Sequence, residues 1–324
     1  MTILKKLSVA LGCLVLSASI VHSQAFPTKD VRIVVAYPAG GAADVIVRSV
    51  AQRLNAKWGH SVIVENKAGG ATQIAAKTVS ESAADGYTMF ATGMETFAIS
   101  PYIRSKLNYD PDKDFIPVSG LGYAHQILAV PADSPLRSIA DVISKAKSEQ
   151  GALQYGTIGM GGSAHINMIL FESLAKVKLT PVHYRGGAPM LTDLLGGHVP
   201  MGFLSVTLLY PNIKEGRLRA LGVGSKTRLP QLPDVPTINE SGVSGFEAVS
   251  WFGLFAPAGT PRDVVTKVNA DLQEIFNNAE FQEKFMAPNF LGSIPGNQQH
   301  FSDYIKAEAA KWSKVVKDAN IKID

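Results

Sequence analysis

The chain has 324 residues, of which 46% are hydrophobic and 18% charged, and it carries 31 basic and 27 acidic side chains. This composition supports a folded core and excludes a long disordered segment, and the length is sufficient for two α/β lobes. The single cysteine, Cys13, excludes an intramolecular disulfide and a thiolate metal site.

The N-terminal residues 1–23 have the pattern of an export signal. Residues 1–6 contain two lysines, an apolar stretch follows from Leu7 to about Val21, and small residues surround Ser23 at cleavage spacing. The order basic, apolar, small is typical of a secretory signal, and the stretch is too short for a retained membrane anchor. We expect cleavage after residue 23 or residue 25, although the exact position stays open.

Removal of this segment changes the charge of the chain. Loss of Lys5 and Lys6 leaves 29 basic and 27 acidic side chains, so the mature protein is close to neutral. No run of lysines and arginines is present, and we therefore expect no nucleic-acid partner. These features predict a soluble protein in the periplasm of a bacterial envelope.

The following residues alternate between β-branched strands, glycine-rich turns and amphipathic helices. Residues 31–36 (VRIVVA) form an apolar run, which predicts a strand buried on both faces of a sheet. Residues 44–58 are expected to be helical, because Val47, Val50 and Leu54 recur on one face. Further strands are expected at 61–65 and 88–91, and a further helix at 73–82.

The same alternation restarts after Pro131. Strands are expected at 153–157, 180–183, 199–204 and 220–223, and helices at 165–176 and 189–195. Residues 228–245 are rich in Pro, Gly and Ser and predict a surface connection. A strand at 246–256 then returns to the first lobe, and helices at 261–277, 279–286 and 298–319 end the chain.

This order predicts an α/β protein with two lobes, each built on a mostly parallel sheet flanked by helices. Lobe 1 would contain residues 24–124 and 245–324, and lobe 2 residues 125–244. Crossings near 123–130 and 245–256 would join them. Open α/β sheets bind ligands at the carboxyl ends of their strands, so the cleft between the lobes is the expected binding site.

Four glycine-rich loops lie between a strand end and a helix start, at 38–43, 68–72, 159–164 and 186–188. Glycine lets backbone N–H groups approach a ligand, and a helix N-terminus adds free donors and partial positive charge. The alternative is that these glycines only allow close packing of helix and strand. Four such loops distributed over both lobes favour an anion, and a carboxylate needs only a few donors. Hydroxyl groups near these loops belong to Tyr37, Thr72, Thr157, Ser163, Tyr184 and Ser205.

Several single residues keep two interpretations. Arg185 is suited to pair with a carboxylate, or to remain solvated on the surface. Asp44 fits a helix N-terminal acceptor of backbone amides better than a ligand contact. His165 can donate to an anion or simply cap and pack. Phe203 and Trp251 can line the cleft or belong to the core.

An exported hydrolase is the rival class. The segment 161–165 (GGSAH) does not fit the nucleophile elbow G-x-S-x-G, because His165 stands at the last glycine position. The histidines of the mature chain show no metal-ligand spacing, and neither nucleotide-binding glycine pattern is present. We therefore expect no enzymatic activity, no metal and no cofactor.

The chain resembles the Bug/TctC family of extracytoplasmic solute receptors of tripartite tricarboxylate transport systems. The resemblance implies a Venus-flytrap fold, a monomer, and a small carboxylate delivered to integral-membrane transporter subunits. A sensor that presents its closed form to a signalling kinase requires the same closure and stays open. The matching motifs are YPAGG at 37–41 with Asp44, VENKAGG at 64–70, ADGY at 84–87, YRGGA at 184–188, DLLGG at 193–197, GRLRAL at 216–221, LPDVPT at 232–237, SWFGL at 250–254 and APAGTP at 256–261.

The resemblance and the loop chemistry together give the expected ligand-binding residues. Glu95 departs from the small neutral residues expected there, so it would repel a second carboxylate or accept an amine. Two further features depart from the family pattern: the turn at 159–163 contains more glycine than expected, and His183 stands in place of an expected proline. The identity of the acid, whether dicarboxylate, hydroxy acid, aromatic acid or amino acid, stays open. The residues expected in lobe 1 are Tyr37, Ala39, Gly40, Gly41, Ala42, Ala43, Gly70, Ala71, Thr72 and Glu95, and in lobe 2 Gly162, Ser163, Ala164, His165, Tyr184, Arg185, Gly186, Gly187, Phe203 and Ser205.

Overall fold

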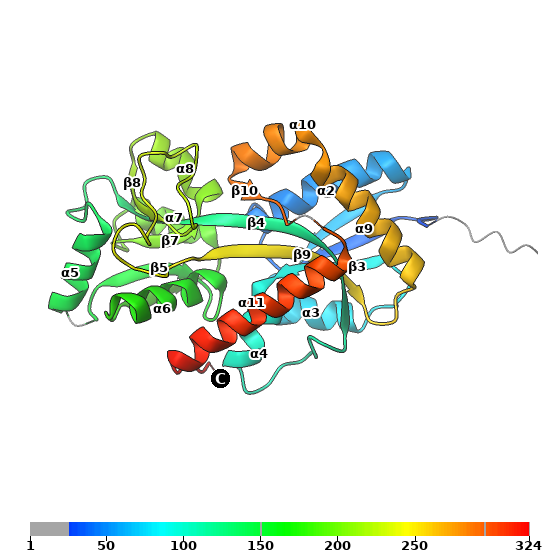
Figure 1. Ribbon diagram of the computed structural model, residues 1–324, viewed down its shortest axis with the longest axis horizontal. Coiled ribbons are helices and arrows are strands. Elements are labelled where there is room, and N and C mark those ends of the chain that lie inside the picture. Colours follow the sequence, from blue (N-terminus) through cyan, green and yellow to red (C-terminus); the bar gives the residue numbers. More distant parts are fainter. Residues whose placement is uncertain (1–25, 150, 295, 324) are drawn as a thin grey trace, which may run out of the picture.

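The computed structural model describes residues 26–149, 151–294 and 296–323 (Figure 1). The predicted export signal and its cleavage site lie outside these residues. Among the described helices, none combines the length and the apolar composition needed to cross a bilayer.

Two lobes lie side by side, and long strands run between them (Figure 1). In lobe 1, β1 pairs in parallel with β2 on one side and β3 on the other, with Val31 opposite Val62. A π-helical turn, Glu95–Ile99, follows β3 and leads into α4. The elements of this part are β1 (Val31–Val35), α2 (Ala42–Trp58), β2 (Val62–Asn66), α3 (Gln73–Ser80), β3 (Thr88–Gly93) and α4 (Ser100–Ile103).

Lobe 2 repeats the arrangement around β5, which pairs in parallel with β6 and β7. Helices α6 and α7 each begin directly after a glycine-containing loop. The elements of this lobe are α5 (Ile139–Glu149), β5 (Gln154–Ile158), α6 (Ser163–Ala175), β6 (Thr180–Tyr184), α7 (Gly187–Leu195), β7 (Gly202–Ser205), α8 (Val206–Lys214) and β8 (Leu218–Val223).

One long strand, β4 (Phe115–Pro131), belongs to both lobes. It pairs antiparallel with β9 (Val249–Pro257) as far as His125, and from Gln126 onward it pairs with β7. The strand order is β2-β1-β3-β9-β4-β7-β5-β6, with β8 and β10 also on β4. The chain then ends with α9 (Arg262–Asn277), α10 (Ala279–Phe281), β10 (Leu291–Gly292) and α11 (Gln298–Asp318).

The core explains why the first strand is apolar throughout. Ile33 and its alternate neighbours pack under α2 and α9, whereas Val34 faces the other side of the sheet, where α3 and α11 pack. In lobe 2, α5 and α6 cover one face and α7 and α8 the other. Each fully buried aliphatic side chain contributes roughly 1.5–3 kcal/mol. Burial on both faces therefore fixes the loops at the strand ends.

The predicted two-lobed α/β fold is confirmed, and most predicted elements lie within a few residues of their observed bounds. Each lobe combines parallel strands with antiparallel ones, because β4 pairs antiparallel with β9 in lobe 1 and with β7 and β8 in lobe 2. The prediction missed α5, α8 and the length of β4. Gly120 and Gly122 interrupt the apolar pattern of β4 and coincide with register shifts against β9, and Pro211 lies inside α8.

Candidate functional site

The loop between β1 and α2 exposes its backbone and is held from below by Asp44. Ala39, Gly40 and Gly41 are exposed, whereas Asp44 is only 3% exposed. The Asp44 carboxylate accepts hydrogen bonds from the Gly40 amide at 2.9 Å and from Arg48 Nε at 2.9 Å. Burial alone would raise the pKa of Asp44, but these donors and the amide of Asn66 outweigh it and lower the pKa. Asp44 therefore shapes the loop rather than meeting a ligand.

The second loop of lobe 1 has an unusual backbone. Gly70, Ala71 and Thr72 have φ angles of 58°, 48° and 77°. These values lie in the left-handed region of the backbone, which residues other than glycine rarely adopt. The Thr72 hydroxyl lies 2.8 Å from Thr96 Oγ1 and is buried. Thr72 therefore fixes the loop inside lobe 1, and Gly70 is the exposed part.

Glu95 joins the two lobes through its carboxylate. The side chain is 4% exposed, and Tyr37 donates its hydroxyl to Oε2 at 2.5 Å. From lobe 2 the Ser163 backbone amide donates to Oε1 at 2.9 Å. Burial and the neighbouring Glu95 charge raise the pKa of Tyr37 well above its ordinary value. Ser163 is the first residue of α6, so this carboxylate lies at a helix N-terminus, where negative charge is stabilised.

The turn before α6 is stabilised by His165, a residue of the same helix. The Gly161 amide donates to His165 Nδ1 at 3.1 Å, and the His165 ring packs edge-on against His183 at 4.8 Å. Burial, with a smaller contribution from His183, lowers the pKa of His165 to about 4. The imidazole is therefore neutral at physiological pH and stabilises the turn.

Ser163 and His165 do not form a nucleophile–base pair. Ser163 Oγ accepts a hydrogen bond from Ser250 Oγ at 2.8 Å, and His165 Nδ1 is engaged by the Gly161 amide. Among the described residues no hydrogen bond links the Ser163 hydroxyl to the His165 ring. This arrangement does not activate the serine, because a general base must contact the hydroxyl whose proton it takes.

A buried polar chain crosses between the lobes beneath α6. Gln126 on β4 donates to Ser250 on β9, which donates to Ser163, and Asn167 Nδ2 lies 3.4 Å from Gln126 Oε1. Sequence reasoning missed Gln126, Ser250 and Asn167. The available signal was a glutamine and a serine inside two apolar strand segments, because buried polar side chains need partners.

Three buried polar atoms near this region have no partner among the described residues: Thr157 Oγ1, Asn167 Oδ1 and Ser205 Oγ. Thr157 lies near the carboxyl end of β5, and Ser205 ends β7 opposite Gln126. Unpartnered buried polar atoms are uncommon in folded proteins. They mark the carboxyl ends of the lobe 2 strands as a polar region.

The loop before α7 also approaches lobe 1. Gly186 is buried and extended, and a Cβ atom there would lie 3.8 Å from Pro38 Cγ of lobe 1. A Cβ atom on Gly187 would lie 2.5 Å from the side chain of Leu208. Arg185 is exposed. There is therefore room for a methyl group at position 186, whereas a larger side chain would meet Pro38.

Tyr184 and Phe203 are directed elsewhere. The Tyr184 hydroxyl donates to Asp193 at 2.9 Å, which together with burial raises the pKa of Tyr184 to about 12. Phe203 is fully buried and its ring lies 6.2 Å from that of Phe246. The structure thus places Phe203 in the core rather than at the cleft surface, and Ala43 and Ala164 are also core residues.

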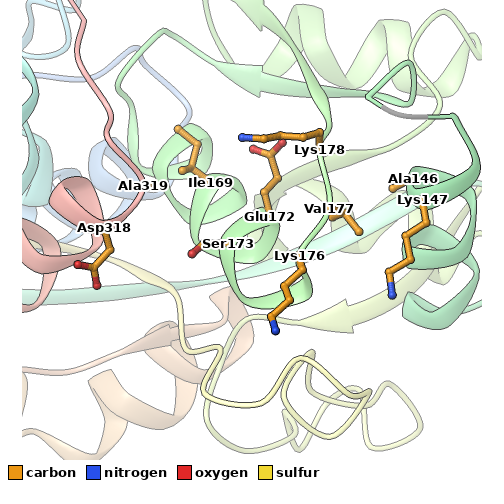
Figure 2. Close-up of a pocket in the computed structure, with 10 residues that line it drawn as sticks. All are labelled: Ala146, Lys147, Ile169, Glu172, Ser173, Lys176, Val177, Lys178, Asp318 and Ala319. Atoms are coloured by element: carbon orange, nitrogen blue, oxygen red, sulfur yellow. The ribbon is translucent and has the colours of Figure 1, made fainter.

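A surface hollow of about 610 Å³ lies at the other end of α6 (Figure 2). Its lining includes Lys147, Lys176 and Lys178 together with Glu172 and Asp318, and burial raises the pKa of Glu172. The length of α6 places this end about 18 Å from Ser163. No predicted ligand-binding residue lines the hollow. In the described part of the chain, no cluster of His, Cys, Asp and Glu is suited to hold a metal ion.

Comparison with known proteins decides the family. Residues 46–321 match the model of the tripartite tricarboxylate transporter family receptor. The chain belongs to this family. The predicted Bug/TctC assignment is confirmed, and the relatives of known structure include periplasmic binding proteins.

The similarity covers nearly the whole chain. A structure described as R. palustris Rpa4515 with adipate has a TM-score of 0.88 and 34% identity, and the match covers 92% of this chain and 99% of that one. MatC from Rhodopseudomonas palustris with bound malate has a TM-score of 0.83 and 28% identity, covering 90% and 100%. A protein in the tcbD-tcbE intergenic region of Pseudomonas sp. strain P51 is 36% identical over 297 residues, which are 90% of this chain and 87% of that protein.

Proposed function

We propose that this protein is a periplasmic receptor that captures one small carboxylate between its lobes and delivers it to a tripartite tricarboxylate-type membrane transporter. It performs no chemistry on the ligand. The observation that carries this proposal is the Glu95 carboxylate, held between the lobes by the Ser163 amide of α6 and the Tyr37 hydroxyl. The contact shows that a helix start in this region accepts a carboxylate, and the helix starts that Glu95 does not occupy are suited to accept the carboxylate of a ligand.

The ligand carboxylate would use the donors that remain exposed. These are the backbone of Ala39 and Gly41 at α2, the loop at Gly70, and the region of Arg185 and Gly187 at α7. The first N–H groups of a helix have no acceptor within the helix, so two helices from opposite lobes offer donors to the same anion. Support comes from the relatives solved with adipate and with malate.

Binding would act by a population shift between open and closed forms. Residues 24–124 with 245–324 would move as one body and residues 125–244 as the other, with β4 and the segment before β9 as the hinge. A ligand that contacts loops of both bodies binds the closed form more tightly, so it depletes the open form. In this proposal Pro38 of lobe 1 and Gly186 of lobe 2 are close to each other in the closed form and move apart in the open form.

The test is a binding screen with the mature protein. A panel of small carboxylic acids, including adipate and malate, is added in a thermal-shift assay and each hit is titrated calorimetrically. We expect one carboxylate per chain, no turnover of the bound acid, and a smaller radius of gyration in solution scattering. Binding of the methyl ester or the primary amide as tightly as the acid would contradict recognition of a carboxylate.

A further inference from the structure

The Glu95 carboxylate is buried and receives its hydrogen bonds from neutral donors. Both oxygens accept a hydrogen bond, one from Tyr37 and one from the Ser163 amide, which is the pattern of an ionised carboxylate. Both donors are neutral, and no ion pair of Glu95 is found in the described part of the chain. Arg104 lies nine residues after Glu95 in the sequence. Its Nε atom is buried and has no hydrogen-bond partner among the described residues, and it makes no ion pair with Glu95.

Burial of a carboxylate without a cation is costly, because the two neutral donors and the N-terminus of α6 compensate only in part for the loss of hydration. A cationic or N–H-donating group of a ligand would supply the missing partner. A ligand carboxylate in the same place would instead meet the Glu95 charge in a region of low dielectric constant, where repulsion between like charges is strong.

Glu95 also takes a donor that a ligand carboxylate would otherwise use. The Ser163 amide at the start of α6 is already occupied by Oε1, whereas the loop before α2 keeps Ala39 and Gly41 exposed. The cleft therefore has one region with free donors and one region that already contains an acceptor.

We propose that Glu95 sets the ligand class: a molecule with one carboxylate, bound at the α2 and α7 loops, and with an amine or another cationic N–H donor that pairs with Glu95. Dicarboxylates bind more weakly, because the internal carboxylate occupies the place of their second acid group. This inference rests on the proposed carboxylate-binding function and names its ligand class.

The experiment compares ligands of equal chain length in the mature full-length protein. Calorimetric titrations use succinate against γ-aminobutyrate and adipate against ε-aminocaproate, with the wild type and Glu95→Gln. The wild type is expected to bind the better amino acid at least tenfold more tightly than its paired dicarboxylate. Glu95→Gln is expected to lower this ratio by at least tenfold, because it keeps the size and removes the charge.

Two variants control for other effects of the substitution. Tyr37→Phe removes a hydrogen bond to Glu95 and an expected ligand-binding hydroxyl but keeps the Glu95 charge, so it should weaken binding of both ligands while the amino acid remains preferred. Glu81→Gln removes an exposed charge on lobe 1, at the end of α3, and should leave both affinities unchanged. If Glu95→Gln does not fold, as judged by circular dichroism, the wild-type ratio alone decides.

Three results are possible and each is informative. A wild-type preference for the amino acid that is lost in Glu95→Gln supports the role of Glu95. An equal or stronger wild-type affinity for dicarboxylates, or a ratio unchanged by Glu95→Gln, overturns it and leaves the carboxylate receptor intact. Failure of the wild type to bind any carboxylate of the broader panel overturns the receptor proposal, and this inference with it.

Discussion

The loops before α2 and before α6 have similar compositions but different surroundings. Both are rich in glycine and join a strand end to a helix start. The loop before α2 is exposed at Ala39 and Gly41, and it is supported from within lobe 1 by Asp44 and Asn66. The loop before α6 is exposed at Gly159 and Met160, but its Gly161 and Ser163 amides already donate to two acceptors, His165 from its own helix and Glu95 from lobe 1.

The difference shows that a glycine-rich helix start is not by itself a ligand site. Its free N–H groups are available only where the rest of the fold provides no acceptor. In this protein the lobe 1 loop leaves Ala39 and Gly41 exposed, whereas the Ser163 amide of lobe 2 is already used for an internal contact between the lobes. Three substitutions sharpen this comparison. One keeps the loop before α7 away from the loop before α2, one removes the Asp44 support of the loop before α2, and one removes the titratable His165 from the loop before α6.

The largest effect is expected from Gly186→Leu, which prevents the two sides from meeting. A leucine side chain at this position would collide with Pro38 in the closed form, since a Cβ atom alone reaches within 3.8 Å of Pro38 Cγ. We expect carboxylate affinity to fall at least 100-fold, about 2.7 kcal/mol, with little change in unfolding free energy. Titration calorimetry measures the first and urea denaturation the second.

Gly186→Ala is the matched control. Its added methyl group makes an ordinary contact and the backbone is extended, so affinity should stay close to that of the wild type. Equal affinity in Gly186→Leu and Gly186→Ala would show that the loops do not approach during binding.

A smaller effect is expected from Asp44→Ala, which removes the support of the exposed loop. Its carboxylate is 3% exposed and accepts from Gly40 and Arg48, so we expect a loss of roughly 2–3 kcal/mol in unfolding free energy. Weaker carboxylate binding should accompany this loss, because the loop is no longer fixed. Asp44→Asn keeps one acceptor oxygen, so its unfolding free energy and its carboxylate affinity should lie between those of the wild type and Asp44→Ala.

The pKa of Asp44 also gives the sign of a pH effect. The pKa is lowered in the folded state, so the contribution of Asp44 is present above its unfolded value and is lost as pH falls through the folded value. The destabilisation caused by Asp44→Ala should therefore shrink in acid. A destabilisation that is constant between neutral pH and strong acid would contradict the role given to its charge.

The smallest effect is expected from His165, which supports the loop before α6. Its folded pKa is about 4, below the ordinary value of 6.5, so the unfolded chain takes up the proton first as pH falls. Stability should therefore decrease between about pH 6.5 and pH 4. We expect the wild type to lose about 2 kcal/mol more than His165→Gln between neutral pH and about pH 4.5.

Urea denaturation at these two pH values measures the difference. His125 has a pKa lowered to about 4 by burial, and burial also lowers the pKa of His183; both remain in the two proteins, so the difference between the profiles reports the loss of His165 and its contact with His183. Parallel pH profiles for the wild type and His165→Gln would show that the imidazole is not neutral in the folded protein.

The sequence was most informative where one local pattern determines the structure. The alternation of strand and helix follows from the spacing of apolar residues, as in 31–36 and α2, because each element packs its own apolar face. The final helices were also predicted to within a few residues. β4 was not, since its glycines and its passage between two lobes interrupt any single period.

The candidate site was only partly accessible from the sequence. Glu95 was identified as a departure from the family pattern, but its hydrogen bond with the Ser163 amide joins residues 68 positions apart and depends on how the two lobes are placed. Gln126 and Ser250 are 124 positions apart and have no local signature. Phe203 carried a usable signal, because it alternates with the core residue Met201 along the strand.

The most direct test of closure on a carboxylate is a distance measured between the lobes. The only cysteine, Cys13, lies in the predicted export signal, so spin labels can be attached at Gln52→Cys on α2 and Ser173→Cys on α6, both exposed positions. Double electron–electron resonance should show a shorter and narrower distance distribution when the carboxylate with the largest thermal shift is added. An unchanged distribution at saturating ligand would contradict closure of the lobes around the bound acid.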